Sequence, residues 1–268
     1  MFLSSFGAYG AEILMKMVER RHAILEILQK EGSADINELA ECLNVSSMTI
    51  RRDLKELAGS GSISILQGVA MLNDGALCEY NMLVKHDIAV DEKRSIARRC
   101  LDFIQDGDSV FLDAGTTAKE FATLVRRSNK SINVLTHSLL AANELTGSRH
   151  ASMVMCPGEY RDMSIAFMGP LTDDFIRKFQ IDTLFLTIEG VDLNGGVSVV
   201  DIADGHTKRV LMDQAKRVIL MADSSKFGKS FFYKVAPLEE VDVIVTDENL
   251  DDKTFEAYSS VCKQVIRA

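Results

Sequence analysis

The chain has 268 residues, enough for two domains, and 47% of them are apolar, as expected of a globular protein with a substantial core. Its five cysteines are scattered without a CxxC pair, which argues against a disulfide framework or a zinc site and favours the reducing cytoplasm. No apolar run approaches the roughly 20 residues that span a bilayer. The net charge of −9 lies mostly after residue 70, so the nearly neutral first part can still bind nucleic acid.

The chain starts with a weakly apolar stretch that has neither the basic region nor the cleavage site of a secretion signal, and we expect the folded part to begin near Met17. A helical pattern of apolar residues then runs to Gly32, and a shorter one follows with Asp35 in position to cap its start. A tight turn separates this helix from a third, which begins at Ser46 or Ser47. Two short helices joined by so brief a turn are typical of a helix-turn-helix.

The third predicted helix, SSMTIRRDLKEL at residues 46–57, combines an apolar stripe with a polar face. Because Ile50, Leu54 and Leu57 recur at helical spacing, we expect them to point inward. Small hydroxyl side chains allow close approach to DNA, and arginine binds guanine edges or phosphates. The alternative is a solvated helix with an Arg52–Glu56 ion pair, although the pattern favours DNA binding. The residues expected on or beside the outward face are Ser47, Thr49, Arg51, Arg52 and Lys55.

After Gly59-Ser60-Gly61, the segment SISILQGVAML predicts a short hairpin, or wing, that lies along the minor groove or the phosphates. From RRHAILEILQKEG to the core S-x-x-T-I-R-R-D-L, the chain resembles the winged helix-turn-helix of the DeoR family of bacterial transcriptional regulators. The resemblance adds Ser46, the first residue of that core, and Gln67 in the wing to the expected DNA contacts. The family usually has His-Gly-Gly where this chain has Gln67-Gly68-Val69.

Residues 71–90 have no clear periodicity, and we place a domain boundary there. The predicted organisation is a winged helix-turn-helix domain at residues 17–73, a linker at 74–90 and an effector-binding and oligomerisation domain at 91–268. In the last of these, short apolar runs alternate with helical patterns, which predicts an α/β fold with a mostly parallel sheet covered on both faces. In such sheets ligands lie beyond the carboxyl ends of the strands.

The stretch DAGTT lies at the first of these strand ends. Asp113 closes the strand, Gly115 permits a tight turn, and Thr116 and Thr117 open the next helix. The arrangement offers backbone N–H groups, hydroxyl donors and the positive end of a helix to an anion. It is equally well a plain turn with a threonine cap.

The later strand ends contribute hydroxyls, an imidazole, a close-approach glycine, a carboxylate for sugar hydroxyls, and cations. Each residue alone is as well explained by a turn or a solvated side chain, and His137 by an exposed loop. Their convergence favours a small phosphorylated ligand. The candidates are Thr136, His137, Ser138, Gly158, Arg161, Glu189, Lys208 and Lys226.

These stretches also resemble the effector domain of the DeoR family, with DAGTT, Gly169-Pro170, EGVD, Lys208-Arg209 and DSSKFG in the family's order. The resemblance implies a fold similar to ribose-5-phosphate isomerase and an effector that is a sugar phosphate or a related metabolite. One departure is His137, where the family usually has asparagine. The effector-binding positions that the resemblance implies for this chain are Asp113, Gly115, Thr116, Thr117, Ser138, Lys208 and Lys226.

We therefore expect a cytoplasmic transcriptional regulator, a repressor of a sugar-metabolism operon that the effector releases from operator DNA, with no cofactor, no metal and no enzymatic activity. Reading two half-sites requires at least a homodimer, and a homotetramer also satisfies this. One alternative is a sugar-phosphate isomerase with Asp113, Glu189 or Asp192 as its base, although the lysine-led loop of those enzymes is absent. Another is a DNA-binding protein whose larger domain only forms oligomers.

Overall fold

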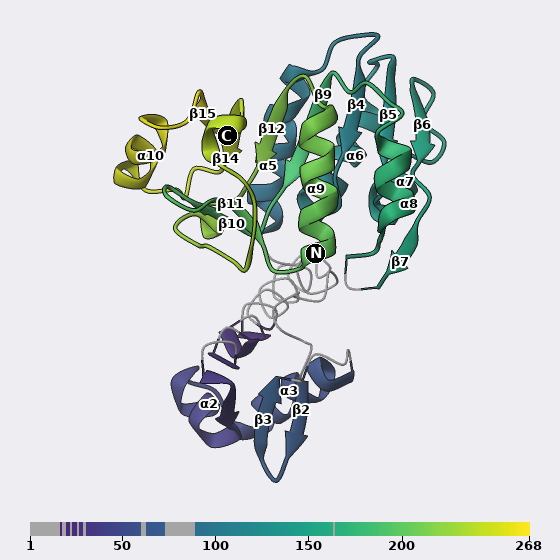
Figure 1. The fold of residues 1–268 in the computed structure, drawn as a ribbon. Coiled ribbons are helices and arrows are strands. Elements are labelled where there is room, and N and C mark those ends of the chain that lie inside the picture. Colours follow the sequence, from purple (N-terminus) through teal and green to yellow (C-terminus); the bar gives the residue numbers. More distant parts are fainter. Residues whose placement is uncertain are drawn as a thin grey trace, which may run out of the picture. The chain divides into compact units, whose positions relative to one another are not determined.

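The computed structural model describes residues 17, 20–21, 23–25, 27–28, 31–59, 63–72, 89–162 and 164–268 (Figure 1). Contacts divide the chain into two compact units, Met1–Ile88 and Ala89–Ala268. Residues 1–16, and all but the last two residues of the predicted linker at 74–90, lie outside the described residues. In the part that is described, no helix has the length and apolar character needed to cross a membrane.

The first unit contains the predicted helices and hairpin. The described residues between 17 and 31 are helical, and α2 (Ile36–Cys42) and α3 (Ser47–Gly59) follow. Strands β2 (Ile63–Leu66) and β3 (Val69–Leu72) form the hairpin, and β1 (Ser33–Asp35), which the sequence did not predict, pairs antiparallel with β3. Gln67 and Gly68 join β2 to β3 with φ angles of 51° and 87°, the left-handed pair that suits a tight hairpin.

The helix caps and the buried residues of this unit are those that the sequence spacing predicts. The Asp35 side chain accepts a hydrogen bond from the Asn37 N–H at 2.7 Å and caps α2. The Ser46 hydroxyl accepts from the Thr49 N–H at 3.2 Å, so Ser46 caps α3, which begins at Ser47. Ile50, Leu54 and Leu57 are buried as predicted. They pack with apolar residues of the first helix, α2, β2 and β3 in one cluster.

The second unit is built on a parallel sheet of seven strands in the order β15-β14-β12-β9-β4-β5-β6. From β4 the chain moves outward through β5 to β6, then returns to β9 on the other side of β4 and proceeds outward to β15. The strand order therefore reverses between β4 and β9, and at such a point two neighbouring crossovers diverge and leave the strand ends accessible to a ligand. The strands are β4 (Ser109–Leu112), β5 (Ile132–Thr136), β6 (Ala151–Met155), β9 (Thr183–Thr187), β12 (Val218–Met221), β14 (Val243–Thr246) and β15 (Val265–Arg267).

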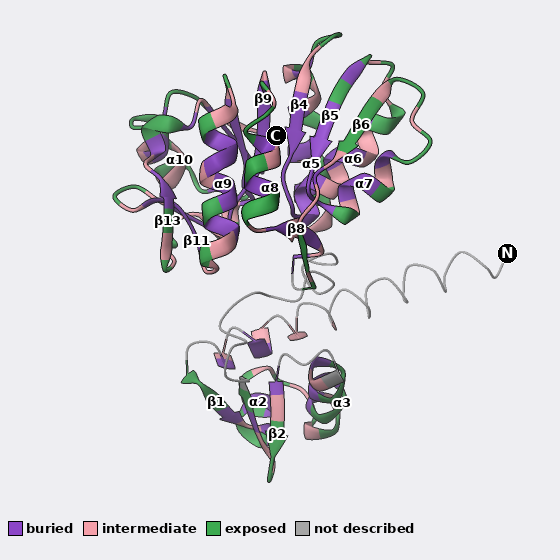
Figure 2. Cartoon of the chain, turned by 45° about the vertical axis from the view of Figure 1, so that its right-hand side comes forward, coloured by how far each residue is buried: buried purple, intermediate pink, exposed green. Residues whose placement is uncertain are grey.

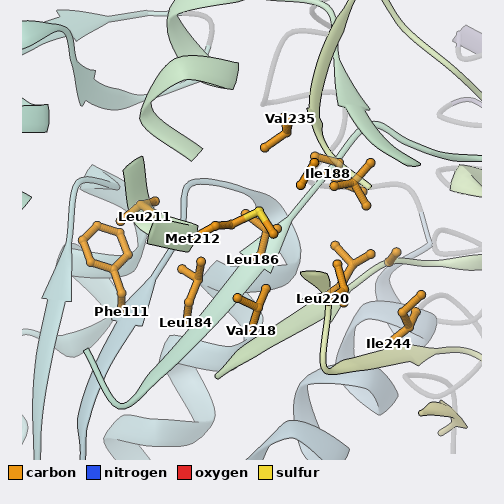
Figure 3. Close-up of a cluster of buried hydrophobic side chains, with 14 of the residues drawn as sticks. Phe111, Leu184, Leu186, Ile188, Leu211, Met212, Val218, Leu220, Val235 and Ile244 are labelled. Atoms are coloured by element: carbon orange, nitrogen blue, oxygen red, sulfur yellow. The ribbon is translucent and has the colours of Figure 1, made fainter. Parts of the chain in front are cut away.

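Helices cover both faces of this sheet. Alternate strand residues face opposite sides, so Phe111 packs in one apolar cluster while its neighbours Val110 and Leu112 pack in the other. Figure 3 shows part of the first cluster, in which Leu184 and Leu186 of β9 lie beside Met212, and Leu220 of β12 lies toward Ile244 of β14. This cluster includes residues of α8 (Pro170–Ile176), α9 (Ile202–Gln214) and α10 (Asp252–Ser259), and the other includes residues of α5 (Val90–Cys100), α6 (Thr116–Arg127) and α7 (Leu139–Leu145).

Short elements that the sequence did not predict complete the second unit. The hairpin of β7 (Glu159–Arg161) and β8 (Ala166–Met168) follows β6, and a small antiparallel sheet contains β10 (Gly190–Asp192), β11 (Gly196–Val199) and β13 (Tyr233–Ala236). Helix α10 and strand β15 were also not predicted. The 3-10 turns are η1 (Leu101–Phe103), η2 (Ser224–Lys226) and η3 (Leu238–Glu240).

Candidate functional site

The outward face of α3 carries two cations with no internal partner in the described residues. Arg51 and Arg52 are exposed, while Ile50 and Leu54 on the same helix are fully buried. Neither arginine forms a hydrogen bond or ion pair within the described part of the chain, and the Arg52–Glu56 pair of a solvated helix is not among the ion pairs there. Lys55 is exposed on the same helix. Both guanidinium groups are therefore accessible to a ligand outside the chain.

The start of α3 is ordered by its hydroxyl side chains. The Ser46 and Thr49 hydroxyl oxygens lie 2.8 Å apart, and Ser46 also caps the helix. Ser47 is half-buried. A capped first turn of this kind presents small donors on a fixed backbone, which suits approach to a phosphate. At the tip of the β2–β3 hairpin, Gln67 is exposed.

A buried ion pair network positions α3, and sequence reasoning missed it. Asp53 is 1% exposed. Its two carboxylate oxygens accept hydrogen bonds from Arg20 Nε at 2.6 Å and from Arg21 Nε at 3.1 Å. One acidic residue of the RRDL motif thus ties α3 to the first helix. The signal was available, because Asp53 stands beside Ile50 and Leu57 on the buried stripe, and a carboxylate there requires partners.

In the second unit, Asp113 at the end of β4 is the centre of a buried polar network at the point where the strand order reverses. Its Oδ2 accepts hydrogen bonds from the Thr187 N–H at 2.9 Å, the Thr187 hydroxyl at 3.0 Å and the Lys208 ammonium at 2.7 Å. Its Oδ1 accepts from the Ala114 N–H at 2.8 Å and lies 3.0 Å from His137 Nε2. Asp113 therefore joins the ends of β4, β5 and β9 to α9.

The Lys208 ammonium is the counter-ion of this network. Its Nζ also lies 3.3 Å from Asp204 Oδ1, one helical turn earlier on α9. Burial alone would lower the pKa of Lys208, but the Asp113 and Asp204 carboxylates raise it above its ordinary value. Burial alone would raise the pKa of Asp113, but Lys208 and then His137 hold it well below its usual range. For Asp204 burial dominates and raises the pKa, against the opposing effect of Lys208.

His137 is fully buried, which excludes the interpretation as an exposed loop histidine. Its Nδ1 lies 3.0 Å from the Phe167 carbonyl oxygen, which only accepts, so Nδ1 carries a proton. Its Nε2 lies between Asp113 Oδ1 and, at 3.1 Å, the Ala114 N–H. Since Phe167 belongs to β8, the imidazole connects the β7–β8 hairpin to the ends of β4 and β5.

The flanking residues of His137 are engaged within the fold. The Thr136 hydroxyl donates to the Leu112 carbonyl at 2.8 Å and accepts from the Ser138 N–H at 3.0 Å. The Ser138 hydroxyl accepts from the Ala141 N–H at 3.2 Å and caps α7. Both side chains are buried, so they fix the course of the chain after β5.

The first turn of α6 holds donors that the described residues do not use. Thr116 and Thr117 are each 7% exposed, and neither hydroxyl has a hydrogen-bond partner in the described part of the chain. The N–H groups of a first helical turn have no acceptor within the helix. Gly115, the N-cap, packs so closely that a Cβ would lie 2.8 Å from the Thr187 hydroxyl oxygen. This turn can therefore receive an anion at a fixed distance from the Asp113 network.

The loop after β6 is held by an ion pair. Arg161 forms a two-pronged pair with Asp201, with Nη1–Oδ1 at 3.2 Å and Nη2–Oδ2 at 2.9 Å. Asp201 also caps α9, so the pair joins the β7–β8 hairpin to that helix. Gly158 is required by close packing, because a Cβ there would lie 2.0 Å from the Thr172 hydroxyl oxygen.

The remaining predicted residues are also engaged. Glu189 Oε2 accepts from the Val200 N–H at 3.0 Å. Lys226 Nζ lies 3.9 Å from Asp223 Oδ2. Burial would raise the pKa of Asp223, but Lys226 and a hydrogen bond from Ser225 hold it below its ordinary value. These contacts hold Glu189 and Lys226 beyond the carboxyl ends of β9 and β12.

The structure thus brings Asp113, His137 and Lys208 into one network and places Thr116 and Thr117 beside it. Sequence reasoning missed Thr187 and Asp204, which belong to the same network. The spacing of Asp204 and Lys208, four residues apart on a helix, is a signal that could have identified the pair. Thr187 gave no such signal, because threonine is a common strand residue and Thr183 stands at the other end of the same strand.

Comparisons with known proteins match both units. The DeoR-like helix-turn-helix domain matches residues 20–75, and the DeoR C terminal sensor domain matches residues 88–248. The chain is 32% identical to the lactose phosphotransferase system repressor of Staphylococcus epidermidis over 88% of this chain and 94% of that one. It is also 32% identical to the glycerol-3-phosphate regulon repressor of Escherichia coli over 87% of this chain and 92% of that one. A ribose-5-phosphate isomerase in complex with phospho-erythronic acid gives a TM-score of 0.39 at 18% identity, covering 52% of this chain and 54% of that chain.

Proposed function

The chain belongs to the DeoR family of transcriptional regulators, and we propose that it is a repressor of sugar-metabolism genes that a phosphorylated sugar releases from operator DNA. The relatives' names support this, since one is a repressor of a lactose phosphotransferase system and another of a glycerol-3-phosphate regulon. We infer a cytoplasmic location, because that is where bacterial operator DNA is found. The observation that carries the proposal is the pair of exposed arginines on α3, neither of which has a partner among the residues that the structure describes.

In the proposed complex α3 lies in the major groove. Arg51 and Arg52 then bind guanine edges or phosphates, Ser47 and Thr49 approach the backbone, and Lys55 adds a phosphate contact. Gln67 at the tip of the β2–β3 hairpin contacts the adjacent minor groove or phosphates. The Asp53 network supports this role, because it fixes α3 against the first helix before DNA binds.

For the effector, we propose that the phosphate binds at the first turn of α6. The N–H groups there, the Thr116 and Thr117 hydroxyls and the positive end of the helix together suit a phosphate. Lys208 then acts through Asp113, by holding the ends of β4 and β9 in place, since its ammonium already serves two carboxylates. The sugar part of the effector extends toward Gly158, Arg161, Glu189 and Lys226.

Release from DNA requires the effector to bind two states of the protein unequally. His137 supplies a physical connection for such a change, because it links the ends of β4 and β5 to the β7–β8 hairpin. An anion beside Asp113 adds negative charge next to a network that holds one ammonium group and two carboxyl groups. We propose that this network readjusts on binding and shifts the population toward the state that does not bind operator.

We further propose that the protein is not an enzyme. The carboxylates that an isomerase would use as a base are engaged elsewhere. Asp113 is enclosed by the network, and Asp192 Oδ1 accepts from the Asn194 and Gly195 N–H groups in the β10–β11 turn. Glu189 accepts from the Val200 N–H.

The test combines operator binding with effector binding. A fluorescent promoter fragment is titrated with protein, and a panel of sugar phosphates is then added while anisotropy and sugar conversion are both followed. Release without conversion is the expected result. Thr116→Val, which removes one hydroxyl, should raise the effector concentration needed for release about tenfold, the effect of roughly 1.4 kcal/mol, and leave operator affinity unchanged.

Thr123→Val is the matched control, because Thr123 lies on the same helix with its hydroxyl bonded to the Lys119 carbonyl and to Glu144. It should leave release unchanged. Conversion of any ester by the parent would overturn the regulator-only proposal. If no ester releases the protein or raises its melting temperature, the second unit does not sense a sugar phosphate.

A further inference from the structure

We propose that strand β6 is an assembly interface, on which β6 of a second copy of this chain pairs antiparallel about Met153 and joins the two sheets into one. The inference rests on the geometry of the strand and not on the identity of the effector. It names a surface on which two copies meet and a register in which they do so.

Strand β6 is one edge of the large sheet, and it lacks the features that prevent edge pairing. It is the last strand in the order, with β5 as its neighbour. Its five residues, Ala151–Met155, include no charge and no proline. Met153 and Val154 are each 37% exposed, and Figure 2 shows the strand at the rim of the sheet, mostly exposed. An apolar edge without such protection is a template for a further strand.

The opposite edge of the sheet differs. Strand β15 has three residues, and its Arg267 is held by an ion pair to Asp252 at 2.8 Å and lies over the Phe255 ring at 4.2 Å. A short edge that carries a charged side chain is protected from pairing. The contrast singles out β6 as the edge that is open to a partner.

The hydrogen bonds at the two ends of β6 show which of its main-chain groups face outward. The His150 carbonyl accepts from the Ile132 N–H at 3.1 Å, and the Cys156 N–H donates to the Thr136 carbonyl at 2.8 Å, so both groups face β5. Main-chain groups of successive strand residues point to opposite sides. The N–H and C=O groups of the odd-numbered residues, Ala151, Met153 and Met155, therefore point away from β5.

This spacing is self-complementary. A two-fold axis through the middle of an edge strand generates an antiparallel pair. With the axis at Met153, that residue exchanges both of its main-chain hydrogen bonds with Met153 of the second copy. Ala151 then stands opposite Met155. The Ala151 N–H already donates to the Ser148 hydroxyl at 3.1 Å, so the central and carboxyl-terminal part of the strand makes most of the new bonds.

Charge and function both favour a second copy of the chain as the occupant. No like charges meet along the strand, and the antiparallel arrangement brings the basic end, with exposed Arg149 and His150, toward the partner's end that carries exposed Glu159. A helix-turn-helix that reads two half-sites needs two copies. Pairing through β6 supplies them without using the carboxyl-end edge of the sheet, where the effector is proposed to bind.

Met153→Pro is the sharpest variant. Proline removes an N–H that points away from β5, so the sheet within one chain keeps its hydrogen bonds while the pairing between copies is blocked. Sedimentation equilibrium should show that the variant has half the mass of the parent assembly. Cooperative thermal unfolding should persist at a somewhat lower melting temperature, because the second copy no longer stabilises the fold. A cooperative transition at half the mass distinguishes loss of assembly from loss of folding. Met153→Lys gives the same result by charge if the proline variant does not fold, and Met153→Val is the matched control that retains assembly.

A disulfide tests the register. In a hydrogen-bonded antiparallel pair the Cα atoms lie about 5.5 Å apart, within the span of a disulfide. Met153→Cys, made after Cys42 and Cys78 are changed to serine, should give a covalent dimer on mild oxidation. Ser152→Cys should not, because residue 152 stands opposite 154. Three results would overturn the proposal: a parent protein that sediments as a single chain at about 50 μM, a Met153→Pro variant with the mass of the parent, or equal cross-linking at positions 152 and 153. The concentration of about 50 μM lies above the dissociation constants typical of specific interfaces.

Discussion

The outward face of α3 and the Asp113 network use the same kinds of charged group in opposite ways. On α3 two arginines are exposed and have no partner in the described part of the chain, whereas at the end of β4 a lysine and two carboxylates are buried and paired. Exposed charges contribute little to stability and are accessible to a large ligand. Buried charges that are already paired with each other do not contact the ligand; they contribute to binding by fixing the positions of the residues that do. The difference separates residues that touch a partner from residues that position others.

The largest effect is expected at Lys208. Lys208→Met leaves Asp113 and Asp204 buried without their cation, and this should lower the free energy of unfolding by about 3–5 kcal/mol. Chemical denaturation followed by circular dichroism measures it. Lys216→Met is the control, because Lys216 pairs with Asp182 at the surface and its loss should change stability little. A Lys208→Met variant as stable as the parent would mean that the network does not hold the sheet edge together.

The two arginines of α3 should show the reverse pattern. Arg51→Ala and Arg52→Ala should each weaken operator binding by about 1–3 kcal/mol, roughly 5-fold to 150-fold. Unfolding should be unaffected, because both side chains lack internal partners in the described residues. Arg127→Ala removes an exposed positive charge from the second unit and should leave operator affinity unchanged. If Arg52→Ala bound operator as tightly as the parent, α3 would not be the helix that contacts the DNA bases.

The pH dependence of stability should distinguish the two carboxylates that share Lys208. The pKa of Asp113 is lowered in the fold, so its contribution is present above the ordinary aspartate pKa of about 3.9 and is lost as the pH falls below it. Asp113→Asn should therefore be much less stable than the parent near pH 7, with a deficit that shrinks toward pH 3.

The contribution of Asp204 to stability should change with pH in the opposite direction. Its pKa is raised, so its contribution is present at low pH and is lost as the pH rises through the folded value. Relative to the parent, Asp204→Asn should gain stability as the pH rises above the ordinary aspartate pKa of about 3.9. Urea unfolding of Asp113→Asn from about pH 4 downward, and of Asp204→Asn from about pH 4 upward, measures the two trends. An Asp113→Asn deficit that grows toward low pH, or an Asp204→Asn stability that falls relative to the parent as the pH rises, would contradict the assigned directions.

The smallest effect concerns the first turn of α3. Ser46→Ala removes the cap on the Thr49 N–H and should cost about 1 kcal/mol of stability. Ser47→Ala should cost less, because α3 begins at Ser47 and its hydroxyl caps nothing among the described residues. Thermal unfolding of the two variants compares them. A larger loss for Ser47→Ala would place the helix start one residue later.

The features that follow local rules were predictable from sequence. Ile50, Leu54 and Leu57 are buried because helical spacing places them on one face, and Asp113 ends a strand because an apolar run stops there. What could not be predicted depends on distant segments. Asp53 gave no indication of Arg20 and Arg21, and β10, β11 and β13 form a sheet from pieces too short to show a period. His137 was ambiguous for the same reason, since its partners come from β4 and β8.

The Asp53 network has a consequence for transplanting the reading helix. Residues 46–57 alone would introduce Asp53 into a foreign scaffold without Arg20 and Arg21, and would bury a carboxylate with no cation to receive it. A chimera built that way should express poorly even when every base-reading side chain is present. The smallest segment that can be transplanted therefore starts before Arg20, because it must include the first helix, whose Arg20 and Arg21 pair with Asp53 of α3.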